Sequence, residues 1–312
     1  MKCLYISLQR INVAADSKKI DTPCQDPSIG SDGLGHLDTR LIFDIGFHIG
    51  DDSAYYLSQG YRVVGVDANP AMIQEGHKRF SKEIASRQLT ILNAAMWHTS
   101  GEKISFYVNQ SYPGKSSLDP DHDELGGKCY QIDVETISVA DLFKTYGVPW
   151  YMKMDIEGAD EMVVRNLPSA SVLPKYFSCE LTLGRPMVDL LASNGYVGFK
   201  LINGGTLTQS LEIYDNEIFI RALRKAGCVC RPIRSLIAGL PKSMRPKKTH
   251  WDPPRLRVPS QLSDQTTGPF GEEADGEWLS ADGMKHHVDN LFAQHTSSNL
   301  GGFWYDLHAK HI

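Results

Sequence analysis

Residues 41–68 read LIFDIGFHIGDDSAYYLSQGYRVVGVDA. The segment opens with an apolar run closed by Gly46, continues with helix-like spacing from Asp51 to Tyr61, and ends in a second apolar run that reaches Asp67. Short apolar runs are typical of buried strands, and apolar residues three or four apart are typical of a helix that covers them. The segment therefore predicts strand, helix and strand, which is the repeating unit of a parallel sheet.

The same alternation continues along the chain. The further elements that we expect in the main sheet and on its faces are a helix at 71–87 and strands at 89–97, 151–158, 176–181, 196–204 and 211–223. We predict an α/β fold with a Rossmann-like, doubly wound and mostly parallel sheet. More than fifty residues separate the third and fourth of these strands. They form an insertion whose expected elements are an edge strand at 103–108, a second strand at 129–136 and a helix at 138–147.

Composition divides the chain into three parts. Residues 1–38 lack sustained periodicity and are predicted to form a lead-in segment. Residues 39–227 carry the strand and helix pattern and are predicted to form the main domain. Residues 228–312 are predicted to form an irregular, Pro-rich and locally basic extension that packs on this domain through its aromatic side chains.

The overall composition is that of a folded protein, with 312 residues of which 41% are hydrophobic and 22% charged. The formal net charge of −5 provides no global positive field, so nucleic acid is not an expected partner. One basic region, Arg221–Arg257, holds 11 Lys or Arg and a single acidic residue. It is either a segment kept solvated by its charge or a surface for an anionic substrate or a partner, and the sequence leaves both open.

The chain shows no apolar run long enough for a transmembrane segment and no signal-peptide pattern. Its six cysteines are scattered without a CxxC pair, which indicates reduced thiols rather than a disulfide framework. We therefore expect a cytoplasmic protein.

The turn after the first predicted strand is the first place to look for a ligand, because open α/β sheets bind ligands at the carboxyl ends of their strands. Gly46 allows a sharp turn and close backbone approach, and Gly50 allows close packing of the next helix. The acid Asp44 repels phosphate, so this turn does not fit the pyrophosphate of a dinucleotide. It suits a cationic ligand such as the sulfonium and ammonium groups of S-adenosyl-L-methionine.

The next two strands also end in polar residues. Asp67 stands where an acid accepts hydrogen bonds from ribose hydroxyls, although it could also serve as a turn or cap residue before Asn69. Asn93 ends the third strand, where its amide could address an adenine edge or form a turn. Acids at two successive strand ends around a glycine turn favour an adenosyl ligand.

The fourth predicted strand carries three charges, Lys153, Asp155 and Glu157, which strand periodicity places on one face. Two carboxylates near a reacting hydroxyl can act as general base and as orienting group. Two alternatives remain open. Lys153 could pair with an acid and simply close the sheet, or Asp155 and Glu157 could hold a metal ion with His48 or Asp51. We favour the role of the two carboxylates as general base and orienting group, and we predict no metal site.

Several stretches occur in an order that resembles the FkbM-type S-adenosylmethionine-dependent methyltransferases, which have the class I methyltransferase fold. They are FDIGFHIGDD at 43–52, GVDANPAM at 65–72, LNAAMWHTSGEKISFYV at 92–108, GKSSL at 114–118, VETISVADLF at 134–143 and KMDIEGAD at 153–160. The sequence departs from the family pattern at two places. His48 replaces a usual Asn, and Asp67-Ala68 replaces a usual Glu-Pro.

The resemblance implies S-adenosyl-L-methionine as cofactor. The cofactor-binding residues that it implies are Asp44, Gly46, His48, Gly50, Asp67, Ala68, Asn93, Ala94 and Asp155. Asp155 and Glu157 are the implied catalytic residues, which face the transferred methyl group and assist removal of a proton, with His48 behind them.

The resemblance also implies methyl transfer to a hydroxyl oxygen of a small-molecule, sugar, glycolipid or polyketide-like acceptor. We expect the loop at 111–128 and the basic region to face this acceptor. Two rival hypotheses are an NAD-dependent oxidoreductase on the same fold and a catalytically inactive protein that binds an adenosyl ligand.

Overall fold

The computed structural model describes residues 36–120, 129–167, 172–181, 184–204, 208–209, 266–298 and 305–312. Several features considered in the sequence lie outside these residues. They are the lead-in segment up to residue 35, the expected strand at 211–223, the basic region, and the cysteines Cys3, Cys24, Cys228 and Cys230. Of the two cysteines described, Cys129 is exposed and Cys179 is buried.

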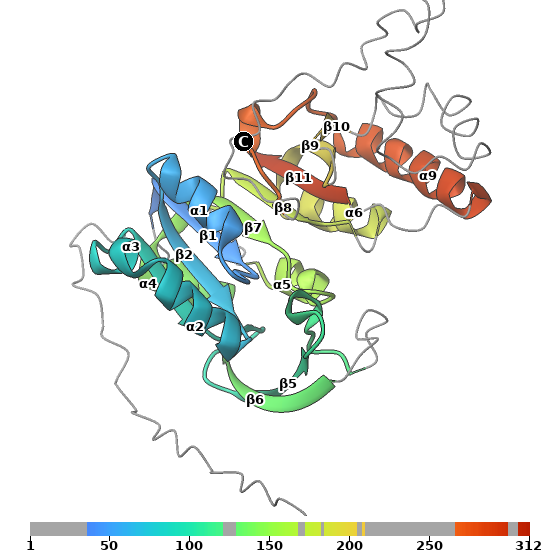
Figure 1. Ribbon diagram of the computed structural model, residues 1–312. Coiled ribbons are helices and arrows are strands. Elements are labelled where there is room, and N and C mark those ends of the chain that lie inside the picture. The colour runs from blue at the N-terminus through green and yellow to red at the C-terminus, as the bar shows by residue number, and fades with distance from the viewer. Residues whose placement is uncertain are drawn as a thin grey trace, which may run out of the picture.

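The main sheet has eight strands in the order β10-β9-β11-β8-β7-β1-β2-β3 (Figure 1). Their bounds are β1 Leu37–Ile45, β2 Arg62–Asp67, β3 Leu89–Asn93, β7 Val148–Met154, β8 Tyr176–Glu180, β9 Tyr196–Asn203, β10 Thr208–Gln209 and β11 Tyr305–His311. Strands β3, β2, β1, β7 and β8 pair in parallel. The chain starts in the middle with β1, winds outward to β3, and then returns to place β7 on the other side of β1. The doubly wound, mostly parallel fold is therefore confirmed.

Helices follow the parallel strands, as the spacing predicts. Their bounds are α1 Asp51–Ser58, α2 Pro70–Arg79, α3 Ser81–Ala85, α4 Val139–Tyr146, α5 Asp160–Arg165, α6 Arg185–Ser193 and α9 Ala281–Ser298. The single helix expected at 71–87 is divided at Phe80, whose buried ring packs against Phe47. The side chain of Asn69 accepts a hydrogen bond from the Ala71 amide at 3.0 Å and so caps the start of α2.

The predicted insertion between the third and fourth strands forms a separate three-stranded sheet. It contains β4 Ala95–Met96, β5 Lys103–Asn109 and β6 Cys129–Ile137, in the order β4-β6-β5. The apolar run at 89–97 thus belongs to two sheets, because the chain leaves the main sheet at Ala94. This small sheet has its own apolar cluster around Phe106 and Val134.

The main sheet is buried on both faces because alternate side chains of each strand enter different clusters. Phe43 of β1 packs against Phe143 of α4 and belongs to the apolar cluster that α5, α6 and α9 also enter on that side of the sheet. Ile42 packs with α1 and Phe270 on the other. Residues that alternate with Phe43 therefore point toward α1, and this places Asp44 on that side.

The end of the chain completes the sheet. Strand β11 runs antiparallel between β8 and β9, and its residues Tyr305–Ala309 are buried. The C-terminal residues are predicted only to form an extension that packs on the domain, and this prediction misses a strand within the sheet. This strand pairs with residues about a hundred or more positions away in the sequence, and local periodicity cannot predict such a pairing. Within the described residues, no helix combines the length and apolar character that crossing a membrane requires.

Candidate functional site

A cavity of about 470 Å³ opens at the carboxyl ends of β1, β2 and β7, where the order of the strands reverses. Among the residues that line it are Gly46, His48, Asp51, Asp52, Asp67, Ala68, Ala94, Met96, Phe106, Ser111–Ser116, Lys153, Asp155, Glu157 and Glu180. Ligands of doubly wound sheets bind at this position, and the volume is typical of small-molecule sites. The structure thus brings most of the predicted site residues to one place.

The turn after β1 is built around Gly46. Its φ of +84° lies in the left-handed region, and its amide donates to the Val66 carbonyl at 2.9 Å. A Cβ at this position would lie 1.8 Å from the carbonyl oxygen of Asp155. Only glycine fits such a turn, so the backbone itself forms this part of the cavity wall.

Asp67 is fixed by two backbone amides. One carboxylate oxygen accepts from the His48 N–H at 2.7 Å, and the other accepts from the Asn69 N–H at 2.7 Å. Burial raises the pKa of Asp67, while these two amides act in the opposite direction. Asp67 serves as a turn residue and also lines the cavity, so the two alternatives left open by the sequence are compatible.

Three of the residues implied as cofactor contacts do not line the cavity. Asp44 is fully buried on the α1 side of the sheet, where Ser53 Oγ donates to it at 2.6 Å. Gly50 lies against the rings of Phe47 and Phe80, in agreement with its expected packing role. The Asn93 amide donates to the carbonyls of Asp67 at 3.0 Å and Ala68 at 3.2 Å, which matches its reading as a turn residue.

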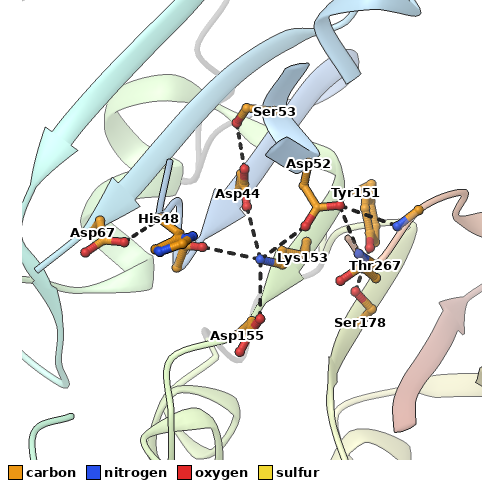
Figure 2. Close-up of polar contacts among 12 residues, drawn as sticks. Asp44, His48, Asp52, Ser53, Asp67, Tyr151, Lys153, Asp155, Ser178 and Thr267 are labelled. Carbon is orange, nitrogen blue, oxygen red and sulfur yellow. Dashed lines mark hydrogen bonds and ion pairs between the residues drawn. The ribbon is translucent and has the colours of Figure 1, made fainter. Parts of the chain in front are cut away.

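Lys153 is buried and lies at the centre of a group of three carboxylates (Figure 2). Its Nζ is 3.5 Å from a carboxylate oxygen of Asp44, 3.5 Å from one of Asp52 and 3.7 Å from one of Asp155. It also donates to the Gly46 carbonyl at 3.3 Å. Burial by itself lowers the pKa of Lys153, but the three carboxylates raise it well above its ordinary value. The lysine is therefore a fixed cation rather than a base.

The chain beyond β7 corrects one prediction. The strand ends at Met154, so Glu157 does not continue the alternation that places Lys153 and Asp155 on one side. Glu157 instead lies in a turn with a φ of +50°, and its carbonyl accepts from Ser117 Oγ at 2.8 Å. His48 has a similar φ of +49°. Positive φ at a residue other than glycine is strained, and such strain is concentrated at functional sites.

One rim of the cavity is the loop Ser111–Ser116. The side chain of Asn109 accepts from the amides of Ser111 at 2.9 Å and Tyr112 at 3.0 Å, and this fixes the start of the loop. The Tyr112 side chain is 65% exposed, which is unusual for a large aromatic residue. This loop is part of the segment 111–128 that is predicted to face the acceptor, and residues 121–128 of that segment lie outside the described residues.

Comparison with known proteins identifies the family. Residues 44–197 match the family model described as the methyltransferase FkbM domain. This part of the chain belongs to the FkbM methyltransferase family. The cofactor of the family is S-adenosylmethionine, as the sequence resemblance implies. No curated protein sequence matches the chain.

The chain is also similar to solved structures with which it shares little sequence identity. One is the O-methyltransferase of a trans-AT PKS multienzyme of Brevibacillus brevis in complex with S-adenosyl-L-homocysteine, at 12% identity and a TM-score of 0.35. That match covers 88% of this chain and 67% of the other. Another is phosphoethanolamine N-methyltransferase 2 of Haemonchus contortus, at 11% identity, a TM-score of 0.35, and coverage of 88% and 49%. This chain thus spans about half of the Haemonchus protein.

The cavity of the FkbM domain fits the family's cofactor. The Gly46 turn leaves backbone, without a Cβ, on the cavity wall. The Asp67 carboxylate is held by amides and retains lone pairs for a ribose hydroxyl. Asp155, which is 47% exposed on the cavity wall, offers a carboxylate to a sulfonium or an ammonium group. Among the described residues, no group of three His, Cys, Asp or Glu side chains is placed to hold a metal ion.

Sequence reasoning missed two parts of this site. Asp52 lines the cavity and pairs with Lys153, and the only signal for it is a second acid in the first turn of a helix after Gly50. Thr267 and Gly268 donate their amides to Asp52 from 215 and 216 residues away. No local pattern predicts such a contact.

Proposed function

We propose that the FkbM domain transfers a methyl group from S-adenosylmethionine to a hydroxyl oxygen of a small-molecule acceptor. The observation that carries this proposal is the position of Asp155. Its side chain is 47% exposed, lines the same cavity as Asp67, and is tethered to Lys153 at 3.7 Å. A carboxylate that is both oriented and accessible is what an acceptor hydroxyl needs in order to lose its proton.

The bound cofactor supplies a methyl group that is already activated by the sulfonium leaving group. The protein therefore has to align the acceptor and remove one proton. In this proposal the Gly46 turn and Asp67 hold the cofactor, and Asp155 accepts the proton of the hydroxyl. Glu157 and His48, the two strained residues on the cavity wall, orient the acceptor.

The rim of the cavity supports the acceptor class that we propose. The loop Ser111–Ser116 offers the exposed Tyr112 ring beside small polar groups. A flat aromatic face next to hydroxyl and amide groups suits an acceptor that has both apolar faces and hydroxyls. We therefore propose a sugar, glycolipid or polyketide-like acceptor.

A labelled-methyl assay tests the proposal. The chain is incubated with S-adenosylmethionine that carries a labelled methyl group and with panels of glycans, glycolipids and hydroxylated polyketides, and products are identified by mass. The expected result is label on an oxygen atom of one acceptor class. Label on nitrogen or carbon would overturn O-methylation.

Thermal shift separates the rival hypotheses. We expect S-adenosylmethionine and S-adenosylhomocysteine to stabilise the protein and NAD to have no effect. Stabilisation by NAD alone would favour an oxidoreductase. Binding of the adenosyl ligands without transfer to any tested acceptor would favour a binding protein that has lost activity.

A further inference from the structure

Asp52 connects two parts of the chain at the floor of the cavity. It is the second residue of α1, is 6% exposed, and lines the cavity beside Lys153. Its Oδ2 lies 3.5 Å from Lys153 Nζ. Its Oδ1 accepts from the Thr267 amide at 3.0 Å and, more weakly, from the Gly268 amide at 3.4 Å (Figure 2).

The segment that carries Thr267 and Gly268 is held in place by the packing of neighbouring side chains. Phe270 stacks on Tyr151 of β7, with ring centroids 4.0 Å apart and an interplanar angle of 6°. Thr266, Thr267 and Phe270 are all buried. The two amides therefore stand in a fixed place beside Asp52, and they are pre-oriented to stabilise its ionised form.

Asp52 and Lys153 lie side by side at the floor of the cavity, and their net charge depends on whether Asp52 is ionised. Lys153 is a permanent cation, and Asp44 is enclosed behind it with Ser53. Burial raises the pKa of Asp52 to about 7, against the lowering effect of Lys153. Asp52 thus gains or loses its charge near neutral pH, while a cation remains next to it.

We propose that Asp52 is a cofactor-site residue that makes the cavity distinguish S-adenosylmethionine from S-adenosylhomocysteine by charge. The two ligands differ at sulfur, which is a positive sulfonium in the donor and a neutral thioether in the product. When Asp52 is ionised, it offsets Lys153 and leaves the floor more negative, so the cationic donor is preferred. The inference rests on the proposed function, because it requires the cavity to bind both ligands.

The pKa of Asp52 depends on the charged and titratable groups that face it from the surrounding elements. Asp44 reaches it from β1, Lys153 and Tyr151 from β7, and Asp155 from the turn after β7. Tyr56 faces it from its own helix α1. Of these side chains, Lys153 favours its ionised form and Asp44 and Asp155 oppose it.

Isothermal titration calorimetry of the whole chain tests the proposal. The affinities for S-adenosylmethionine and S-adenosylhomocysteine are measured at pH 6 and pH 8 in the parent and in Asp52→Asn. The quantity compared is the ratio of the affinity for S-adenosylmethionine to the affinity for S-adenosylhomocysteine. At pH 8 we expect this ratio to be about three- to tenfold higher in the parent than in the variant, and at pH 6 we expect little difference. Titration of the ligands themselves is common to both proteins and cancels in this comparison.

Further variants keep the test decisive. Asp38→Asn, which removes a partly exposed carboxylate of β1 that does not line the cavity, should behave as the parent. Asp52→Ser, smaller and also uncharged, replaces Asp52→Asn if that variant does not fold. An equal preference and equal pH dependence in the parent and in a folded uncharged variant would overturn the inference alone. No binding of either ligand by the parent would overturn the proposed function as well.

Discussion

The carbonyl oxygen of Asp155 occupies the space beside Gly46 where a side chain would begin, 1.8 Å from the position of a Cβ. The turn after β1 and the turn after β7 therefore touch through backbone. We predict that Gly46→Ala destabilises the domain by more than about 3 kcal/mol, because either turn must move and the left-handed φ of +84° is also unfavourable for alanine. Urea unfolding measures this loss, and calorimetry with S-adenosylhomocysteine measures the accompanying loss of affinity.

A matched control separates the contact from the backbone conformation. Gly101 has a φ of +81°, and a Cβ there would meet nothing within 4 Å. Gly101→Ala should therefore cost only about 1 kcal/mol and leave ligand affinity unchanged. Equal losses in the two variants would show that the contact with Asp155 does not matter.

A second prediction concerns the buried end of the charge group. Asp44 is fully buried, with Ser53 and Lys153 as partners. Asp44→Ala removes a close partner of a buried cation, and we expect a loss of about 3 kcal/mol or more in the free energy of unfolding. Asp38→Ala on the same strand breaks an exposed pair with Arg62 and should cost less than about 1 kcal/mol. Comparable denaturation midpoints for the two variants would contradict a structural role for Asp44.

Most of the fold could be predicted from the sequence because its strands are short apolar runs. Such runs indicate buried strands without any information from distant residues. The sequence also predicted the glycine turn and Asp67, since both follow directly from the ends of strands. The sequence does not determine whether Asp44 faces the cavity or α1. Strand alternation shows only that the side chains of Asp44 and Phe43 point to opposite faces of the sheet. The ion pair of Asp52 with Lys153, and strand β11, depend on contacts between distant segments and have no local signal.

The proposed proton acceptor gives a third prediction. Asp155→Asn should lower the rate of methyl transfer about 100-fold, because the amide cannot take the proton of the acceptor hydroxyl. Glu157→Gln should lower turnover while affinity for S-adenosylhomocysteine is largely kept. Glu161→Gln, on the exposed face of α5 beside Arg165, is the control and should retain parent activity. Parent rates in both site variants would assign Asp155 and Glu157 a structural role only.

The last prediction concerns the pH dependence of stability, and it rests on Asp160 at the start of α5. This residue is 1% exposed, and among the described residues neither of its carboxylate oxygens has a hydrogen-bond partner of normal geometry. Burial raises the pKa of Asp160 to about 7, and the nearby charge of Asp155 adds to the effect. The folded protein therefore keeps a proton that the unfolded chain releases near pH 4.

The sign follows from this difference in bound protons. The contribution of Asp160 to the free energy of unfolding is fully present below about pH 4 and falls as the pH rises toward 7. It levels off above the pKa of the folded state, after a total loss of up to about 4 kcal/mol. Asp160→Asn does not titrate, so it should be more stable than the parent at pH 8 and show a flatter profile. Asp52 acts in the same direction and leaves some slope in the variant. Urea unfolding at pH 5 and pH 8 measures both slopes, and identical slopes in parent and variant would mean that Asp160 is ionised in the folded protein at neutral pH.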